Sequence, residues 1–477
     1  MMLSALLPDK TTMLRALIAG TKKPANGASS PDAPPVLKTR LPAVGEGLAM
    51  LVDPVRFQKL CHEAVGDAFT LSIFGLPLVL VQGPEAIARF SSADDDELDL
   101  ITAYQKLLGK LLGEELFQPI PRPMLRELSG QSVRKRSAAL ARDAANFLEA
   151  KMRGPQGEID ALRLCSELVL EMTCRFVCGD TLSRERIAEI ASLFEVLESD
   201  YSVVGLFLPI ETPALRRRVQ ARERLIAVFE EEIQRAVASI DGLEDGYLRT
   251  VIDSMLGPDP SRASRSQLRS AAVAIMGVVF GAHTNTANSL ALSLLDVLER
   301  PALEAELRDE RARVLAGDRP IDLGALCQMP ALLRAINESM RMKGGGVLWR
   351  YTHSPFRIGA YEIPAKSFVG ISMSLLHQDP AVYPRPERYE PERYAAMNTD
   401  DFQSPPLKDK TYGVWGIGKH VCPGRGVAYT IIASALTVLL DRCALSVTAA
   451  PKRWHPLVTA GIARPIGAFR VRWARRD

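Results

Sequence analysis

Residues 415–426 read WGIGKHVCPGRG, and the interpretation of the whole chain starts from this stretch. Cys422 follows closely spaced glycines and leads directly into an apolar segment. The pattern predicts a helix that starts here, with Cys422 at the N-cap and Pro423 at the first helical position, where its missing N–H does no harm. The N–H groups of a first turn, together with the helix dipole, would favour a thiolate over a thiol at Cys422.

Gly416, Gly418 and Gly424 carry no side chain, so we expect them to let the backbone approach something flat and bulky. Haem iron takes a thiolate in such a dry pocket as its proximal ligand in oxygen-activating enzymes.

Two other interpretations of the cysteine segment compete with the haem site. Residues 413–419 nearly spell a phosphate-binding loop, but His420 stands where Ser or Thr must bind Mg²⁺, and no buried strand precedes it. The second alternative is a nucleophilic Cys422 paired with His420. Side chains two positions apart in a tight loop are, however, rarely oriented so that one can take a proton from the other.

The composition describes a globular chain with ample material for a core: 477 residues, 47% hydrophobic and 24% charged. A formal net charge of +3 is too small to indicate a nucleic-acid-binding protein. An odd number of scattered cysteines, seven, favours a reducing compartment and predicts a cytoplasmic protein. The apolar runs 271–282 and 428–440 are too short for transmembrane segments and predict buried helices instead.

The order of patterns along the chain predicts a flexible lead-in, residues 1–36, followed by one large, mainly helical domain with small β-sheets, residues 37–477. Residues 69–83 predict a two-stranded hairpin, and residues 346–372 predict a second β-rich patch. Helical periodicity predicts helices at 131–153, 159–178, 183–199, 215–240, 265–299, 301–314 and 423–441.

The cysteine loop resembles the haem-binding loop of the cytochrome P-450 family. The family pattern is Phe-Gly-x-Gly-x-(His/Arg)-x-Cys-x-Gly, and one position departs from it, Trp415 for Phe. The matching positions are Trp415, Gly416, Gly418, His420, Cys422 and Gly424. The resemblance implies the cytochrome P-450 fold, a mostly helical triangular prism, with haem b held through Cys422 as the metal ligand. Weaker similarity extends over roughly residues 37–477.

A second family marker, Glu-x-x-Arg on a helix, matches Glu338-Ser-Met-Arg341. The same spacing occurs elsewhere in the chain, where it usually means a surface ion pair. Position distinguishes this copy, because residues 391–394 (PERY), similar to the family's Pro-Glu-Arg-Phe, follow at a suitable distance before the cysteine loop. The resemblance implies a buried structural network of Glu338, Arg341 and Arg393 that holds the loop.

Haem carries two propionates, which need cationic or hydrogen-bonding partners. By resemblance, His420 is one partner, and Arg350 matches the strand arginine that holds a propionate. A third contact is expected from the helix near residues 131–140, through Arg134 or Arg136, and the sequence does not choose between them. The alternative for both arginines is a solvated helix face.

Residues 272–291 (AVAIMGVVFGAHTNTANSLA) resemble the long helix that crosses above haem, whose usual pattern is Ala/Gly-Gly-x-(Asp/Glu)-Thr. Gly281 and Ala282 are expected to leave space for dioxygen. Thr284 and Asn285 replace the acid and the alcohol that relay protons in the family, which puts the ordinary relay in doubt. An Asn amide still holds a ligand oxygen or a water by hydrogen bonding.

Thr286 is a candidate substitute hydroxyl, although it points about 100° further round the helix than Asn285. We expect His283 to be a hydrogen-bonded core or groove residue rather than an iron ligand. Similar Asn-containing helices occur in the relatives of prostacyclin synthase and of the bile-acid sterol hydroxylases. The first rearranges a peroxide without external electrons and the second hydroxylates with oxygen, so both reactions stay open.

The resemblance implies a monooxygenase that inserts one oxygen atom from O₂ into a hydrophobic small molecule such as a terpenoid, a sterol or a fatty-acyl-like compound. The alternative is an electron-independent enzyme acting on a peroxide, as an isomerase, dehydratase or peroxygenase. Electrons would come from a separate ferredoxin or flavodoxin and its reductase. A basic docking patch is expected at Lys408, Lys410, Lys419 and Arg425. We expect a monomer whose apolar pocket is built from 90–125, 200–215, 275–290 and 347–348.

Overall fold

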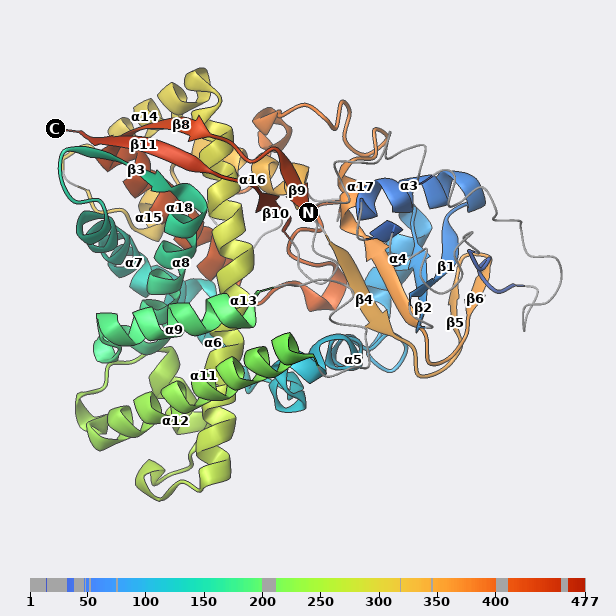
Figure 1. Ribbon diagram of the computed structural model, residues 1–477, viewed down its shortest axis with the longest axis horizontal. Coiled ribbons are helices and arrows are strands. Elements are labelled where there is room, and N and C mark those ends of the chain that lie inside the picture. The colour runs from blue at the N-terminus through green and yellow to red at the C-terminus, as the bar shows by residue number, and fades with distance from the viewer. Residues whose placement is uncertain are drawn as a thin grey trace.

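The computed structural model describes residues 53–73, 76–199, 212–317, 319–344, 346–399, 411–455 and 462–476, with residues 14, 32–37, 47 and 49–50 in addition. The chain is mainly helical with small sheets, which confirms the predicted fold class. In Figure 1 most helices lie to the left and the strands β1, β2 and β4 to the right, with the long helix α13 running vertically between them.

The seven helices predicted by range, which correspond to α7, α8, α9, α11, α13, α14 and α18, begin and end within two residues of the predicted positions, and the other helices were not predicted individually. The helices before α13 are α3 (Pro54–Val65), α4 (Pro84–Ser92), α5 (Leu100–Leu112), α6 (Arg122–Glu127), α7 (Gly130–Lys151), α8 (Ala161–Cys178), α9 (Arg184–Leu197), α11 (Pro213–Ala238) and α12 (Tyr247–Met255). Those from α13 on are α13 (Arg265–Leu298), α14 (Pro301–Val314), α15 (Leu323–Leu326), α16 (Pro330–Lys343), α17 (Met373–His377) and α18 (Arg425–Arg442).

The strands form four small sheets. The largest has the order β1-β2-β7-β4, with β1 (Ala68–Ile73) and β2 (Leu76–Val81) as the predicted hairpin, and β4 (Val347–Tyr351) and β7 (Phe368–Ser372) from the predicted β-rich patch. β5 (Phe356–Ile358) pairs with β6 (Tyr361–Ile363). The sequence analysis did not predict the strands near the C-terminus or β3; they are β3 (Gln156–Asp160), β8 (Cys443–Ala449), β9 (Arg453–His455), β10 (Arg464–Ile466) and β11 (Arg470–Arg475).

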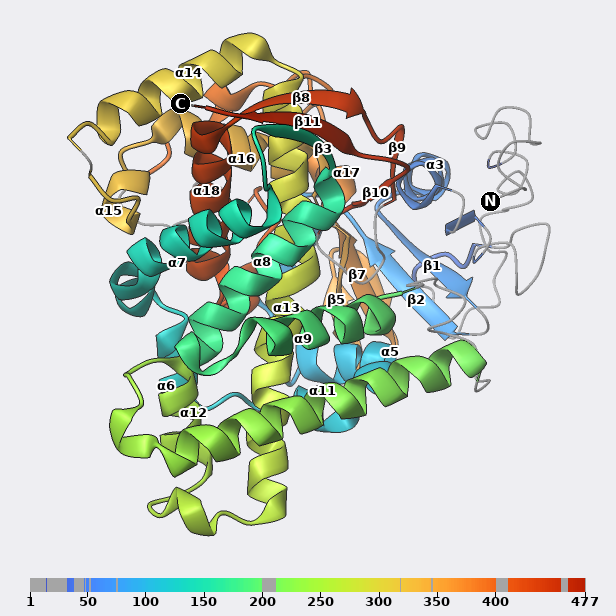
Figure 2. The ribbon, with the colours of Figure 1, turned by 60° about the vertical axis from the view of Figure 1, so that its left-hand side comes forward.

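Two long helices form the centre of the molecule. α13 has 34 residues, and Ser264 opens it with a capping box that Gln267 completes. α18 is buried along almost its whole length, as expected of a helix that is apolar all round. α18 packs against both α7 and α13, and Figure 2 shows it behind α7 and beside α13.

The two apolar runs therefore lie in buried helices, 271–282 in α13 and 428–440 in α18. Among the residues that the structure describes, no helix has the length and apolar character to cross a bilayer.

Candidate active site

The cysteine loop is a tight turn built on its own backbone. The N–H of Cys422 donates to the Trp415 carbonyl at 2.7 Å. Gly416 has φ 87° and Gly418 has φ 69°, values that favour glycine. A Cβ at Gly418 would lie 2.2 Å from the Ser91 carbonyl oxygen, and one at Gly416 would lie 2.7 Å from the His420 carbonyl oxygen. These two glycines are thus required by contacts of the chain with itself, and the approach of a flat group to them stays a prediction.

Helix α18 starts later than predicted. Its N-cap is Gly424 and its first residue is Arg425, so Cys422 lies in the turn before the helix, where its carbonyl accepts a 3.3 Å bond from the N–H of Arg425. The prediction of Cys422 at the N-cap was therefore wrong by two residues. The N–H of Gly424 nevertheless points at the sulfur, and a Cβ on Gly424 would lie 3.9 Å from it.

The Cys422 side chain is poor at ionising on its own. Burial raises the pKa of its thiol above the ordinary value, while the Gly424 N–H and the charge of Arg425 act in the opposite direction. A metal ion coordinated by the sulfur would reverse this balance, because it deprotonates a coordinating thiol outright. The sulfur in this turn therefore suits a metal ligand better than a free nucleophile.

Arg350 is a buried cation that forms no ion pair in the described part of the chain, although the negative charges of Asp95 and Asp99 act on it from further away. It lies on β4, is 4% exposed, donates to the Trp349 carbonyl at 3.0 Å and stacks over the Phe90 ring at 5.1 Å. Burial lowers its pKa, which the neighbouring Tyr104 opposes. A buried guanidinium without a carboxylate is costly unless an anion joins it. The site therefore fits a group that carries carboxylates, as haem does.

His420 lies beside Arg350, but a protein carboxylate already engages its ring. Nε2 of His420 lies 2.6 Å from Oδ1 of Asp95. Burial lowers the pKa of His420, and the positive charge of Arg350 lowers it further, whereas Asp95 raises it. The structure thus brings His420 and Arg350 together, as the sequence analysis expected, and adds Asp95, which it did not.

The structure does not bring Arg134 or Arg136 to this site. Arg134 is exposed, and Arg136 stacks on Phe176 of α8 at 5.7 Å with its guanidinium beside Gly246. Among the described residues no hydrogen bond or ion pair links either arginine to Cys422, Arg350 or His420. These contacts turn Arg136 toward α8 and the start of α12, and the third propionate contact through Arg134 or Arg136 stays a prediction. Tyr104 of α5 lies near Arg350 instead, and its pKa is raised by burial.

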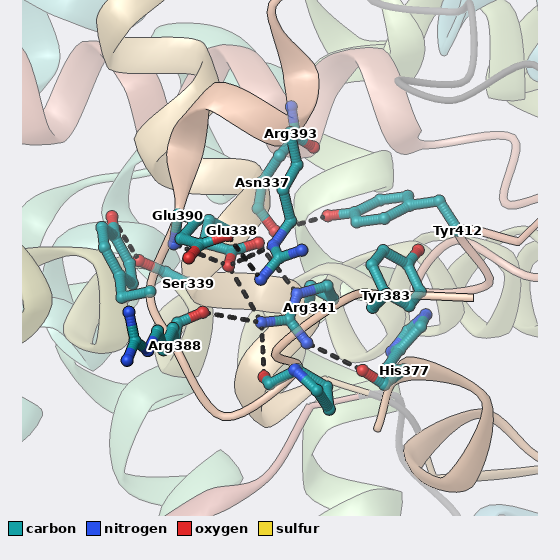
Figure 3. Close-up of polar contacts among 12 residues, drawn as sticks. Asn337, Glu338, Ser339, Arg341, His377, Tyr383, Arg388, Glu390, Arg393 and Tyr412 are labelled. Carbon is teal, nitrogen blue, oxygen red and sulfur yellow. Dashed lines mark hydrogen bonds and ion pairs between the residues drawn. The ribbon is translucent and has the colours of Figure 1, made fainter. Parts of the chain in front are cut away.

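The Glu-x-x-Arg residues meet the second arginine in one buried cluster (Figure 3). Arg341 donates to both oxygens of Glu338, at 2.8 and 2.9 Å, and Arg393 approaches the same carboxylate at 3.3 Å. The side chains of Glu338 and Arg341 are 0% exposed. The remaining N–H groups of Arg341 donate to the backbone carbonyls of His377, Pro386 and Arg388, and those of Arg393 donate to the carbonyls of Pro384 and Arg385.

Two bonds join this cluster to the cysteine loop. The Gly413 N–H donates to Nε2 of His377 at 3.2 Å, and the Tyr412 hydroxyl donates to the Asn337 carbonyl at 3.1 Å. Burial lowers the pKa of His377 to about 4, so the ring is neutral and able to accept. The sequence analysis missed His377 and Tyr412, although both flank the motifs that it used. Trp415, at the variable first position of the loop, packs on Tyr429 of α18 with 5.1 Å between ring centroids.

On α13 the predicted residues divide between two faces. A Cβ on Gly281 would meet nothing within 4 Å, so there is open space beside it, next to Ala282. Oδ1 of Asn285 accepts a 3.3 Å bond from the N–H of Ile462, and no hydrogen bond of its amide N–H₂ group is found among the described residues. Thr284 instead lines a cavity shared with α8 and α9, and Thr286 is buried.

His283 is hydrogen bonded, as predicted. It is 5% exposed and contacts Ser166 and Glu198.

The basic docking patch is not a set of free cations. Lys408 and Lys410 lie outside the described residues. Lys419 forms ion pairs with Asp94 at 3.1 Å and Asp95 at 3.5 Å, and Arg425 is only 7% exposed. The expectation of a free basic surface was thus wrong for Lys419 and Arg425, because the acidic segment after α4 neutralises the first and the fold buries the second.

Comparisons with known proteins place this geometry in a family. A sterol 14alpha-demethylase of Mycolicibacterium vanbaalenii is 24% identical over 439 residues, which cover 89% of this chain and 94% of that protein. A sterol 14-demethylase of Arabidopsis thaliana is 25% identical over 462 residues, 93% of this chain and 92% of the relative. These relatives do not confirm the likeness of α13 to the prostacyclin synthase branch. A family profile described as Cytochrome P450 matches residues 34–473, and the chain therefore belongs to the cytochrome P450 family.

Proposed function

We propose that this chain holds haem b through Cys422 and, as a monooxygenase, inserts one oxygen atom from O₂ into a hydrophobic small molecule. Membership of the family makes the chain an oxidoreductase with haem iron. The observations that support the site are the turn that presents the Cys422 sulfur and a buried cation, Arg350, that forms no ion pair among the described residues.

The residues around Cys422 have distinct tasks in this proposal. Arg350 and His420 bind the propionates, and Tyr104 takes the place expected of Arg134 or Arg136. Trp415 and Gly416 shape the loop, and Gly424 leaves the space beside the sulfur free of a side chain. The group so held would supply the activation of dioxygen. The network of Glu338, Arg341 and Arg393 fixes the loop through His377 and Tyr412.

The face of α13 at Gly281 and Ala282 provides the space in which oxygen and substrate meet. Asn285 is fixed by Ile462 and keeps its N–H₂ group for an oxygen atom or a water in that space. Thr286 is less suited to this role, because its position lies about 100° further round the helix. Thr284 faces the other cavity, so in this proposal it acts only through its neighbours.

The substrate class follows from the relatives, whose names describe demethylation of sterols. We propose a sterol, or a terpenoid or long acyl compound of similar size, in an apolar pocket formed by α5, α13 and β4. Part of the expected pocket, residues 200–211, lies outside the described residues. The proposal includes a lead-in at 1–36, a catalytic domain at 37–477, a monomeric protein in the cytoplasm, and electrons from a ferredoxin or flavodoxin with its reductase.

Turnover tests the reaction type directly. Purified haem-loaded protein is first screened with sterols, terpenoids and fatty acids for a Soret shift, and each binder is then incubated with NADPH, ferredoxin and ferredoxin reductase. We expect a product that carries one more oxygen atom, labelled when ¹⁸O₂ is used. Conversion of a hydroperoxide without electrons, with no product from the complete redox system, would overturn the proposal in favour of the electron-independent alternative.

A further inference from the structure

A cavity of about 690 Å³ lies between α8, α9 and α13, away from the cysteine loop. Figure 2 shows these three helices side by side, and α13 contacts α8 extensively. Its wall combines apolar side chains, among them Leu170, Ile187 and Ala191, with a larger number of polar and charged ones of both signs, such as Arg163 and Glu195. The residues on its α13 side are His283, Thr284, Ala287 and Asn288. The proposed oxygen chemistry uses none of this wall directly.

Three polar side chains on this wall are arranged in series. Oγ of Ser166 on α8 lies 2.9 Å from Nε2 of His283. Nδ1 of His283 lies 3.1 Å from Oε2 of Glu198, just past the end of α9. The side chains of His283 and Glu198 are 7% and 12% exposed. A nucleophile, a base and an acid that orients the base, each within hydrogen-bond reach of the next, form the arrangement that activates serine in acyl transfer.

The tautomer of His283 follows from its partners. An ionised Glu198 only accepts hydrogen bonds, so Nδ1 of His283 must carry the proton between them. Nε2 of the neutral ring then has a free lone pair, which accepts the hydroxyl proton of Ser166. His283 is thereby set to act as a general base toward Ser166, and the Phe194 ring, 5.5 Å away, packs against the imidazole from the side.

Hydrogen-bond donors for a developing oxyanion are present in the same cavity. Ser166 lies inside α8, so its backbone N–H is committed to the helix and cannot serve. Nδ2 of Asn288 and Oγ1 of Thr284 are buried, line the cavity and have no partner among the described residues. Asn288 is 4% exposed and follows Thr284 by one helical turn, so both groups lie on the same face of α13. Unsatisfied donors that face a cavity indicate a polar group that binds there.

We propose that this cavity is a second active site, a serine acyl-transfer site that hydrolyses a carboxylic ester with a short acyl chain. Ser166 Oγ bonds to the carbonyl carbon while its proton passes to Nε2 of His283. The carbonyl oxygen takes up the negative charge and is held by Asn288 and Thr284. The bond from carbon to the alcohol oxygen then breaks, and that oxygen receives the proton from His283.

Water completes the reaction. It attacks the acyl carbon and gives one proton to His283, the bond between Ser166 Oγ and the carbon breaks, and Ser166 regains its proton. The products are a carboxylic acid and an alcohol, with no change in oxidation state. The small apolar part of the wall, at Leu170, Ile187 and Ala191, accommodates a short acyl chain.

Covalent labelling of the haem-loaded protein tests the site independently of its redox activity. The protein is treated with an alkyl fluorophosphonate, digested with trypsin, and the peptide of residues 164–175 is sequenced by mass spectrometry. We expect the label on Ser166, none in Ser166→Ala, and a strong decrease in His283→Gln and Glu198→Gln. Ser192→Ala is the matched control, because Ser192 lines the same cavity without a histidine beside it and should leave the label unchanged.

Hydrolysis of p-nitrophenyl butyrate gives the second readout. Ser166→Ala should lower the rate by on the order of 10³-fold or more, and Asn288→Leu by on the order of 10²-fold, as for the loss of one oxyanion donor. An unchanged haem absorption spectrum in each variant shows that the fold is intact. Wild-type protein without label on Ser166, or labelling that His283→Gln leaves unchanged, would overturn the proposal whatever the outcome at the haem site.

Discussion

At the scale of single residues, Cys422 is the position at which the proposed site can be tested most directly. Replacing Cys422 with Ala removes the sulfur and, by the proposal, the axial ligand, while the bond from N–H of residue 422 to the Trp415 carbonyl is retained. We expect the thiolate-type absorption of the reduced CO complex to be lost. Cys443→Ala is the matched control, since that buried cysteine lies at the start of β8. An unchanged spectrum in Cys422→Ala would refute the ligand assignment.

Arg350 allows the haem contact to be separated from folding. Its charge is buried without an ion pair among the described residues, so Arg350→Met should leave the haem-free chain as stable as before, or more stable. The same variant should bind haem more weakly, by about 1.5–3 kcal/mol for a lost hydrogen bond between charged groups. Urea unfolding of the haem-free protein and the rate of haem transfer to apomyoglobin measure the two effects. Equal haem retention in both proteins would exclude the contact.

At the scale of structural elements, His377 connects helix α16 to the cysteine loop, and its pKa gives the connection a pH dependence. The folded pKa is about 4, against about 6.5 in an unfolded chain. Between these values the unfolded state binds a proton that the folded state does not, so stability falls as pH drops from 6.5 to 4. The full effect is about 3 kcal/mol. This stabilising contribution of the neutral His377 ring is present at neutral pH and is lost in acid.

His377→Gln isolates this contribution, because Gln keeps one donor for the Gly344 carbonyl and one acceptor for the Gly413 N–H without titrating. We expect the difference in unfolding free energy between wild type and variant to change by about 3 kcal/mol between pH 7 and pH 4. Urea titrations at both pH values, with His353→Gln as an exposed control, measure it. Parallel stability curves for wild type and His377→Gln would contradict the assignment.

The elements also show what the sequence could predict. The loop at 415–426 and the Glu338–Arg341 pair were found because their residues are close in sequence and their types are distinctive. The start of α18 was misplaced, since the turn at Cys422 depends on contacts with Trp415 and His420 that no local pattern encodes. The contact of Arg136 with Phe176 could not be predicted, because the packing of α7, and not the charge pattern, decides which way its side chain turns.

Contacts between elements that lie far apart in the sequence could not be predicted from it. Tyr104 and Arg350 are 246 positions apart (350 − 104), and Ser166, Glu198 and His283 come from three different elements. Each of these residues by itself is an ordinary member of an amphipathic helix or a strand. Ser166 and Glu198 come within hydrogen-bond distance of His283 only because α8 and α9 pack on α13.

At the scale of the whole molecule, the cysteine loop lies between two apolar clusters. Ile417 belongs to the smaller one, which contains α4 and residues of β2, β5 and β7, whereas Val414 and Trp415 pack against the larger one around α13 and α18. The haem site is therefore supported from both sides. A loss of packing in either cluster should therefore destabilise the cysteine loop.

Two core substitutions test this. Ile371 on β7 lies in the smaller cluster and Leu290 on α13 in the larger, both 0% exposed. Ile371→Ala and Leu290→Ala should each lower the unfolding free energy by about 2–5 kcal/mol. Because the loop needs both clusters, each variant should release haem at a lower urea concentration, seen as loss of the Soret band alongside loss of far-ultraviolet circular dichroism. Val196→Ala, at a position that is 40% exposed, should change neither. Haem release that stays at the wild-type midpoint in Ile371→Ala would show that the smaller cluster unfolds independently of the site.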